Sequence, residues 1–168
     1  MARPGITTRL LAGAFLIKDG HFLMMKRSET RAFYPGVWGA VGGHLEPNEI
    51  NEPRAACLRE IYEETGITED DLTGLDLRYI ALRRQDTEIR VLYTYMGYAK
   101  TYAYEDKTDE GTLHWIKKED VLDRECSFVH RRALAHFMEH EKDTRVMAGA
   151  VRLVDNEPVL EWTPVADW

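Results

Sequence analysis

Long apolar runs are missing from this sequence. No stretch approaches the roughly 18 consecutive apolar residues of a membrane-spanning helix, and residues 1–5 lack the apolar core of a secretory signal. A membrane partner is therefore not expected, and we predict a protein of the cytoplasm.

Cysteine and positive charge are also scarce. The two cysteines, Cys57 and Cys126, are expected to be buried reduced thiols, which fits a reducing cytosol. The 29 acidic residues outnumber the 22 basic ones and give a formal net charge of -7. This charge repels polyanions, so we do not expect a nucleic acid polymer as a partner. A phosphorylated small molecule is still compatible with it if metal ions supply positive charge locally. The six histidines show no metal-ligand grouping, which argues against a zinc site.

Strand-like and helix-like patterns follow one another irregularly along the 168 residues, which suffice for one ordinary core. Asp19-Gly20 is a strong hairpin signal. Pro53 suits the first residue of a helix and Gly66 the residue just past its end. Because regular strand–helix–strand alternation is lacking, we expect an α/β protein with a mixed β-sheet and helices packed on it. The predicted strands span residues 10–18, 21–27, 37–41, 72–84, 89–99 and 112–116, and two further helices span 117–123 and 127–142.

The carboxyl-terminal segment differs from the rest. Residues 146–154 and 159–162 are apolar-rich and flank the polar stretch 155–158, which predicts a terminal β-ribbon. We therefore predict a main domain over residues 1–143 and a β-ribbon extension over 144–168. The extension either belongs to the same domain or forms the contact of a homodimer.

Three carboxylates in the helix after Pro53 indicate a candidate metal-binding site. Glu60, Glu63 and Glu64 stand at i, i+3 and i+4, so they share one helical face. Like charges at this spacing repel, and partial burial increases that cost and raises the carboxylate pKa values. A cation offsets the repulsion, and hard carboxylate oxygens suit Mg²⁺ or Mn²⁺. An acidic triplet alone is more often a solvated helix face, so the flanking residues decide between the two interpretations.

The flanking residues resemble the Nudix box. That motif has a glycine, a glutamate after a short spacer, and then Arg-Glu-aliphatic-x-Glu-Glu-x-Gly-aliphatic. This chain has nine residues between Glu49 and Arg59, two more than the pattern has. We place the extra pair at residues 50–51, ahead of the helix, which leaves the register of the glutamates intact but puts the role of Glu49 in doubt. The matching positions are Gly43, Glu49, Arg59, Glu60, Ile61, Glu63, Glu64, Gly66 and Ile67.

The resemblance implies the Nudix fold, an α/β/α sandwich with a mixed central sheet, and assigns roles to residues. Glu60, Glu63 and Glu64 would be metal ligands, with the carbonyl of Gly43 as a further one, and Glu60 is also a candidate general base. Glu110 is our choice for an additional ligand or base. The alternative for Glu110 is an ordinary solvated loop acid.

Substrate contacts are predicted for four side chains. Arg27 ends a strand and suits a phosphate, or it forms a surface salt bridge. Phe33 and Tyr34 lie in a loop where they can touch a base. Arg59 can reach Glu63 at i+4 and is also assigned to substrate binding. Core positions rather than base stacking are expected for Trp38 and Trp115.

The resemblance to bacterial MutT-like members implies the function. The expected reaction is Mg²⁺-dependent (or Mn²⁺-dependent) hydrolysis of a phosphoanhydride bond in a nucleoside diphosphate derivative. The first candidate substrate is a nucleoside triphosphate, with an oxidised purine nucleotide among the options, giving a monophosphate and pyrophosphate. ADP-ribose and nucleotide sugars stay open. The rival from another class is a non-catalytic nucleotide sensor, which should have lost the metal carboxylates.

Overall fold

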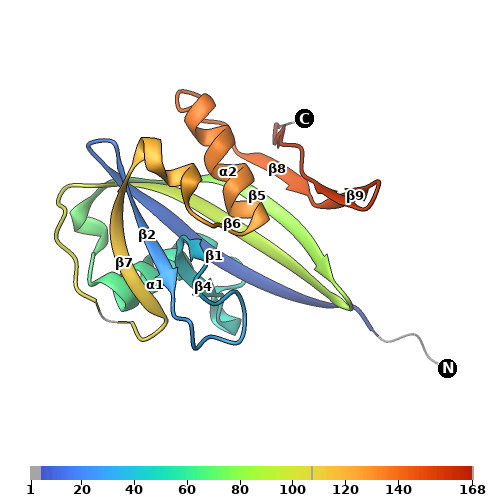
Figure 1. Cartoon of the computed structure of the whole chain (residues 1–168), viewed down its shortest axis with the longest axis horizontal. Coiled ribbons are helices and arrows are strands. Elements are labelled where there is room, and N and C mark those ends of the chain that lie inside the picture. The colour runs from blue at the N-terminus through green and yellow to red at the C-terminus, as the bar shows by residue number, and fades with distance from the viewer. Residues whose placement is uncertain (1–4, 107, 168) are drawn as a thin grey trace.

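One mixed β-sheet with a helix on each face forms the body of the protein (Figure 1). The computed structural model describes residues 5–106 and 108–167. The predicted α/β class with a mixed sheet is confirmed. The strands are β1 (Thr7–Lys18), β2 (His21–Arg27), β3 (Trp38–Gly39), β4 (Val41–His44), β5 (Leu72–Gln85), β6 (Glu88–Ala99), β7 (Gly111–Lys117), β8 (Met147–Ala150), β9 (Arg152–Val154), β10 (Glu157–Val159) and β11 (Thr163–Pro164). The α-helices are α1 (Pro53–Thr65) and α2 (Phe128–Glu139), and short 3₁₀ helices cover Pro47–Glu49, Glu69–Asp71 and Lys118–Asp123.

Strand β1 organises the sheet. One of its edges pairs in parallel with β6 along almost its whole length. The other edge is divided, because residues 11–14 pair with β4 and residues 16–18 pair with β2. Beyond β6 the sheet continues through β5, β8 and β11.

Alternation along β1 builds two hydrophobic layers. Ala12, Ala14 and Leu16 point to the face covered by α1, where they pack with Cys57 and Ile61. The residues between them point to the face covered by α2, where Phe15 belongs to a second cluster that includes Ala133, Leu134 and Phe137. The strand is thus buried on both faces, as its near-continuous apolar sequence requires.

The turn between β1 and β2 and both ends of α1 lie where the sequence predicted them. The hairpin between β1 and β2 turns at Asp19 and Gly20, both with positive φ (45° and 74°). Helix α1 begins at Pro53, and Gly66 ends it in the left-handed conformation (φ 71°), donating its N–H to the carbonyl of Tyr62.

Several predicted boundaries need correction. The apolar stretch 37–41 is two strands, β3 and β4, because its ends pair with different partners, β2 and β1. The segment predicted as a helix over 117–123 is a 3₁₀ helix, Lys118–Asp123. Ser127 is the N-cap of α2 and not its first turn, since its side chain accepts the N–H of His130. Both cysteines are free thiols, but only Cys57 is buried as expected; Cys126 is half-buried, because it lies outside any helix in an isolated bridge with Trp38.

The carboxyl-terminal ribbon exists but is shorter than predicted. β9 and β10 form an antiparallel pair whose turn, Asp155–Asn156, has positive φ. The stretch 146–154 is divided, because β8 leaves the ribbon and pairs in parallel with β5 in the main sheet. Met147, at the start of β8, is buried in the core beneath α2. Residues 147–150 therefore extend the main sheet, while the predicted homodimer contact stays a prediction.

No helix in the part of the chain that the structure describes is long and apolar enough to cross a membrane.

Candidate active site

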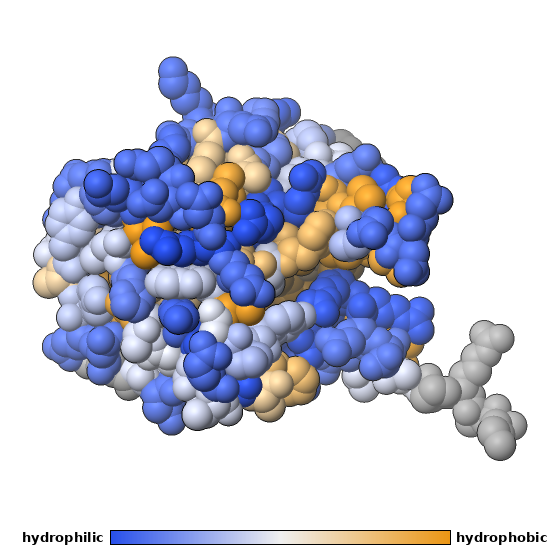
Figure 2. All heavy atoms as spheres, in the orientation of Figure 1, coloured by the Kyte–Doolittle hydropathy of each residue, from blue (hydrophilic) through white to orange (hydrophobic). Residues whose placement is uncertain are grey.

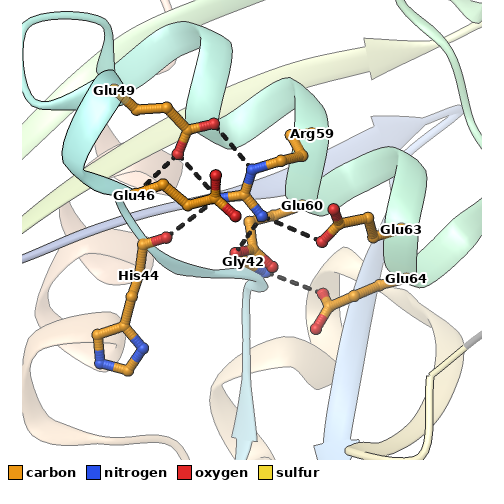
Figure 3. Close-up of polar contacts among 8 residues, drawn as sticks. All are labelled: Gly42, His44, Glu46, Glu49, Arg59, Glu60, Glu63 and Glu64. Atoms are coloured by element: carbon orange, nitrogen blue, oxygen red, sulfur yellow. Dashed lines mark hydrogen bonds and ion pairs between the residues drawn. The ribbon is translucent and has the colours of Figure 1, made fainter.

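Helix α1 presents its three glutamates on one face, beside the backbone of β4 (Figure 3). Burial differs among them. Glu64 is buried, the side chain of Glu60 is largely covered, and that of Glu63 is 53% exposed. The face therefore borders the core at one end and solvent at the other, as predicted from the helical spacing.

Two glycines in β4 make room for these carboxylates. The N–H of Gly42 donates to Oε2 of Glu64 over 3.0 Å. A Cβ at Gly43 would lie 2.5 Å from Oε1 of Glu60, so the carboxylate packs directly on the glycine backbone. Glycine at 43 is thus a steric requirement of the Glu60 position.

Arg59 donates hydrogen bonds to three of the acidic side chains in the site. Its Nε and Nη2 donate to the two carboxylate oxygens of Glu49 (2.8 and 2.9 Å), and Nη1 donates to Glu60 (2.9 Å) and Glu63 (3.0 Å). Nη2 also donates to the carbonyl of His44 (3.1 Å). Every N–H group of the guanidinium therefore has a partner within the protein. This arrangement favours a positioning role for Arg59 over the predicted substrate contact, while its predicted link to Glu63 is present.

Glu49 contacts Arg59 despite the two-residue insertion. Residues 50–51 form a turn between the 3₁₀ helix Pro47–Glu49 and α1, where the extra length is taken up before the helix begins. Glu49 is 8% exposed, and besides Arg59 it accepts the N–H of Glu46 (2.9 Å). Glu49 thus contacts the arginine of the motif, and its role in the reaction stays a prediction.

The carboxylates on this face of α1 repel one another, which favours the binding of a cation. Burial, then the charge of Glu60, raises the pKa of Glu64 to about 8, and burial also raises the pKa of Glu60. Arg59 by contrast holds the pKa of Glu49 down at about 2. In residues 5–106 and 108–167 no three acidic, histidine or cysteine side chains already surround one point as metal ligands. The donor set nevertheless fits a hard dication, because two repelling carboxylates and a glycine backbone share one recess.

A cavity of about 290 Å³ opens beside the acidic face. Its walls come from the backbone of Gly42 and Gly43, the α2 face of the sheet, the loop after β2 and the first turn of α2. In Figure 2 a hollow with apolar walls separates the carboxyl-terminal ribbon from the end of the β5–β6 hairpin. If the phosphates of a ligand lay at these glycines, the remainder of a nucleotide-sized molecule would lie in the cavity.

Comparisons with known proteins agree with this geometry. The sequence profile described as NUDIX domain matches residues 7–146. The chain belongs to the NUDIX family. A nucleoside triphosphatase NudI from Klebsiella pneumoniae is 28% identical over 141 residues, which cover 76% of this chain and 94% of that protein. The NudI protein of Salmonella agona is 36% identical over 58 residues, and this match spans only 40% of its length. The mutator MutT protein of Bacillus halodurans superposes with a TM-score of 0.72 at 21% identity, covering 94% of this chain and 99% of that one, which shows a shared fold.

The predicted MutT-like Nudix hydrolase is therefore confirmed at the level of family and enzyme class. Family membership also fits a divalent metal at the glutamates of α1.

Glu110 lies near the Nudix glutamates but is engaged by arginines. Its Oε1 lies 2.6 Å from Nη2 of Arg31, and its Oε2 lies 3.8 Å from Nη1 of Arg27. The charge of Glu110 contributes to the raised pKa values of Glu60 and Glu64. Glu110 is thus paired with arginines and is not an isolated solvated acid. Its role as a metal ligand or base stays a prediction.

The cavity contains three of the four predicted substrate contacts. Arg27, Phe33 and Tyr34 all line it, and Phe33 is 62% exposed. Nε of Arg27 donates to the carbonyl of Phe33, which fixes the loop to the end of β2. The roles themselves stay predictions.

Sequence reasoning missed other cavity residues. Trp38, assigned to the core, is half-buried and lines the cavity, whereas Trp115 packs beneath α1 and donates to the carbonyl of Tyr102. His130 also lines the cavity, and burial lowers its pKa to about 4, so its ring is neutral at pH 7. The cavity is further lined by Arg9, Arg83 and Arg90, whose alignment depends on strand pairing that no local signal reveals.

Proposed function

We propose that this Nudix enzyme hydrolyses a phosphoanhydride bond of a nucleoside triphosphate, releasing a nucleoside monophosphate and pyrophosphate in the presence of Mg²⁺ or Mn²⁺. The observation that carries the proposal is the acidic face of α1, which borders a cavity of nucleotide size with aromatic and arginine walls. The NudI relatives, named nucleoside triphosphatases, support the choice of substrate.

The division of labour follows from the positions of the side chains. Glu60, Glu63 and Glu64, with the carbonyl of Gly43, would hold the metal, which supplies charge neutralisation to the phosphates when bound. Arg59 keeps Glu60 and Glu63 oriented through its Nη1 contacts. Glu60, pressed against Gly43 and with its pKa raised, is our candidate for accepting the proton of the attacking water.

The cavity residues would hold the nucleotide. Arg27 lines the cavity, where its planar fork suits a phosphate. Phe33, Tyr34 and Trp38 offer ring faces for a base. An oxidised purine nucleotide is one substrate in this class, and ADP-ribose and nucleotide sugars are the alternatives to a triphosphate. Cytoplasmic location, the homodimer, and the lack of nucleic acid and membrane partners also stay predictions.

Replacing Glu63 tests the enzyme assignment. Glu63→Gln should lower kcat by orders of magnitude in Mg²⁺, because a carboxylate that the proposal assigns to the metal becomes neutral. Its stability should hardly change, since the side chain is 53% exposed. Activity is read as released phosphate after added pyrophosphatase, across a panel of nucleotides with Mg²⁺ and Mn²⁺.

Glu69→Gln is the matched control, because Glu69 is exposed, lies beyond the end of α1 and pairs with Arg54 outside the acidic face. Full activity of Glu63→Gln would refute the assignment of Glu63 to the metal, whereas a wild type that hydrolyses no nucleotide of the panel would refute the enzymatic assignment and favour a nucleotide sensor.

A further inference from the structure

Three arginines stand in one row across the sheet. Arg9 of β1 is paired with Arg90 of β6, and Arg90 is paired with Arg83 of β5. Residues paired in this way point to the same face of a sheet, and all three arginines line the cavity. The row therefore forms a cationic end wall built from three separate strands.

The row lies away from the acidic face of α1. The neighbouring row on the same face is apolar and consists of Leu11, Leu92 and Ala81, which also line the cavity. The next residue of β1 on this face, Gly13, is paired with Gly42 beside the glutamates. Four residues of strand separate Arg9 from Gly13, which corresponds to about 13 Å. An apolar middle thus divides a metal-binding end from a cationic end.

The positive charge of the row is only partly compensated. Its salt bridges, within residues 5–106 and 108–167, run to one carboxylate, that of Glu88, which lies 2.9 Å from Nε of Arg9 and 2.6 Å from Nε of Arg90. Arg83 donates instead to the neutral hydroxyl of Tyr34 and lies over the Tyr34 ring. Three guanidinium groups and one carboxylate leave an excess of positive charge in a chain whose net charge is -7.

Such an arrangement is costly without a ligand. Like charges directly opposite each other destabilise a sheet, and Arg83 and Arg90, which are half-buried, lose hydration. In Arg9 and Arg90 the Nε pairs with Glu88, and Nη1 of Arg9 also contacts Nε2 of His44 (3.2 Å), which leaves Nη2 of Arg9 and the Nη groups of Arg90 for other partners. A phosphate group matches these planar forks in charge and geometry.

We propose that the row of Arg9, Arg83 and Arg90 binds a second phosphate on the nucleoside half of the substrate. The preferred substrates are then nucleoside diphosphate derivatives that carry a phosphate on the ribose, at the 2′ or the 3′ position. This inference rests on the proposed function for the identity of the scissile bond, but the anion subsite itself is tested by binding alone. The apolar row between the two ends accommodates the uncharged part of the nucleoside.

The test is equilibrium binding of three adenine nucleotides in Mg²⁺: 5′-AMP, adenosine 2′,5′-bisphosphate and adenosine 3′,5′-bisphosphate. One bisphosphate should bind at least about tenfold more tightly than 5′-AMP, equivalent to about 1.4 kcal/mol, and the two bisphosphates reveal which ribose position is read. Arg83→Gln and Arg90→Gln should each reduce this ratio toward one. Arg84→Gln is the control, because Arg84 is on the same strand, is exposed and is absent from the cavity wall.

Thermal unfolding of each variant separates loss of the subsite from loss of the fold, and Arg83→Lys retains the charge without the fork if the glutamine variant is unstable. Equal binding of 5′-AMP and both bisphosphates by the wild type would overturn the inference. So would a tenfold preference that survives in both glutamine variants. Failure of the proposed function appears differently, as a lack of phosphoanhydride hydrolysis in the nucleotide panel whatever the binding ratio.

Discussion

The ion pair between Glu49 and Arg59 should stabilise the fold measurably, and Glu49→Gln isolates its contribution. Arg59 holds the pKa of Glu49 down from about 4.5 to about 2, which is equivalent to about 3 kcal/mol in favour of the charged, folded form. The side chains of Glu49 and Arg59 are 11% and 24% exposed, so water screens part of this energy. We expect the substitution to lower the free energy of unfolding at pH 7 by about 2 kcal/mol.

The pH dependence gives the sharper form of this prediction. The folded-state pKa of Glu49 lies below the unfolded-state value, so the stabilisation is complete above about pH 4.5 and is lost as the pH falls through about 2. The difference between wild type and Glu49→Gln should therefore shrink over that acid range. Urea unfolding followed by tryptophan fluorescence measures it directly.

Glu52→Gln serves as the control for the same turn, because Glu52 is exposed and its side chain makes no capping hydrogen bond. The reasoning would be refuted if Glu49→Gln were as stable as the wild type at pH 7. It would also be refuted if the difference in their free energies of unfolding did not change with pH. Equal stability would mean that desolvation of the pair cancels its attraction, whereas a difference independent of pH would mean that the charge of Glu49 is not its source.

Three further predictions concern the site and its supports. Because burial and the charge of Glu60 raise the pKa of Glu64 to about 8, the metal-free protein should lose stability as the pH rises from about 4.5 through 8. Mg²⁺ should then raise the Tm more at about pH 8.5 than at about pH 6, and equal gains in a thermal-shift assay would contradict this. Gly43→Ala would place a Cβ 2.5 Å from Oε1 of Glu60, so kcat/KM should fall by at least about tenfold while the Tm changes little; unchanged kinetics would show that Glu60 need not rest on this glycine. Ser127→Ala removes the side chain that accepts the His130 N–H and should cost about 1 kcal/mol in urea unfolding, whereas an unchanged midpoint would show that the cap contributes nothing.

Short-range rules predicted the catalytic helix well. Pro53 and Gly66 marked its ends, and a spacing of 3.6 residues per turn put the three glutamates on one face. The hairpin at Asp19-Gly20 followed from turn chemistry in the same way. These features depend on residues within a few positions of one another, so the sequence contains all the information they need.

Pairing between distant strands determined the features of the fold that the sequence did not predict. The sequence of residues 37–41 cannot show that β3 pairs with β2 and β4 with β1, since that depends on the divided edge of β1. The same limit applied to the carboxyl-terminal segment, where contact with β5 draws β8 into the main sheet.

What the sequence by itself determined is the acidic motif and the helix that displays it. Only the tertiary structure decided that Glu49 still reaches Arg59 across the insertion, and that Arg9, Arg83 and Arg90 share one wall. The reason is physical: a helical face repeats locally, whereas the neighbours of a strand are fixed by the cooperative packing of the whole sheet.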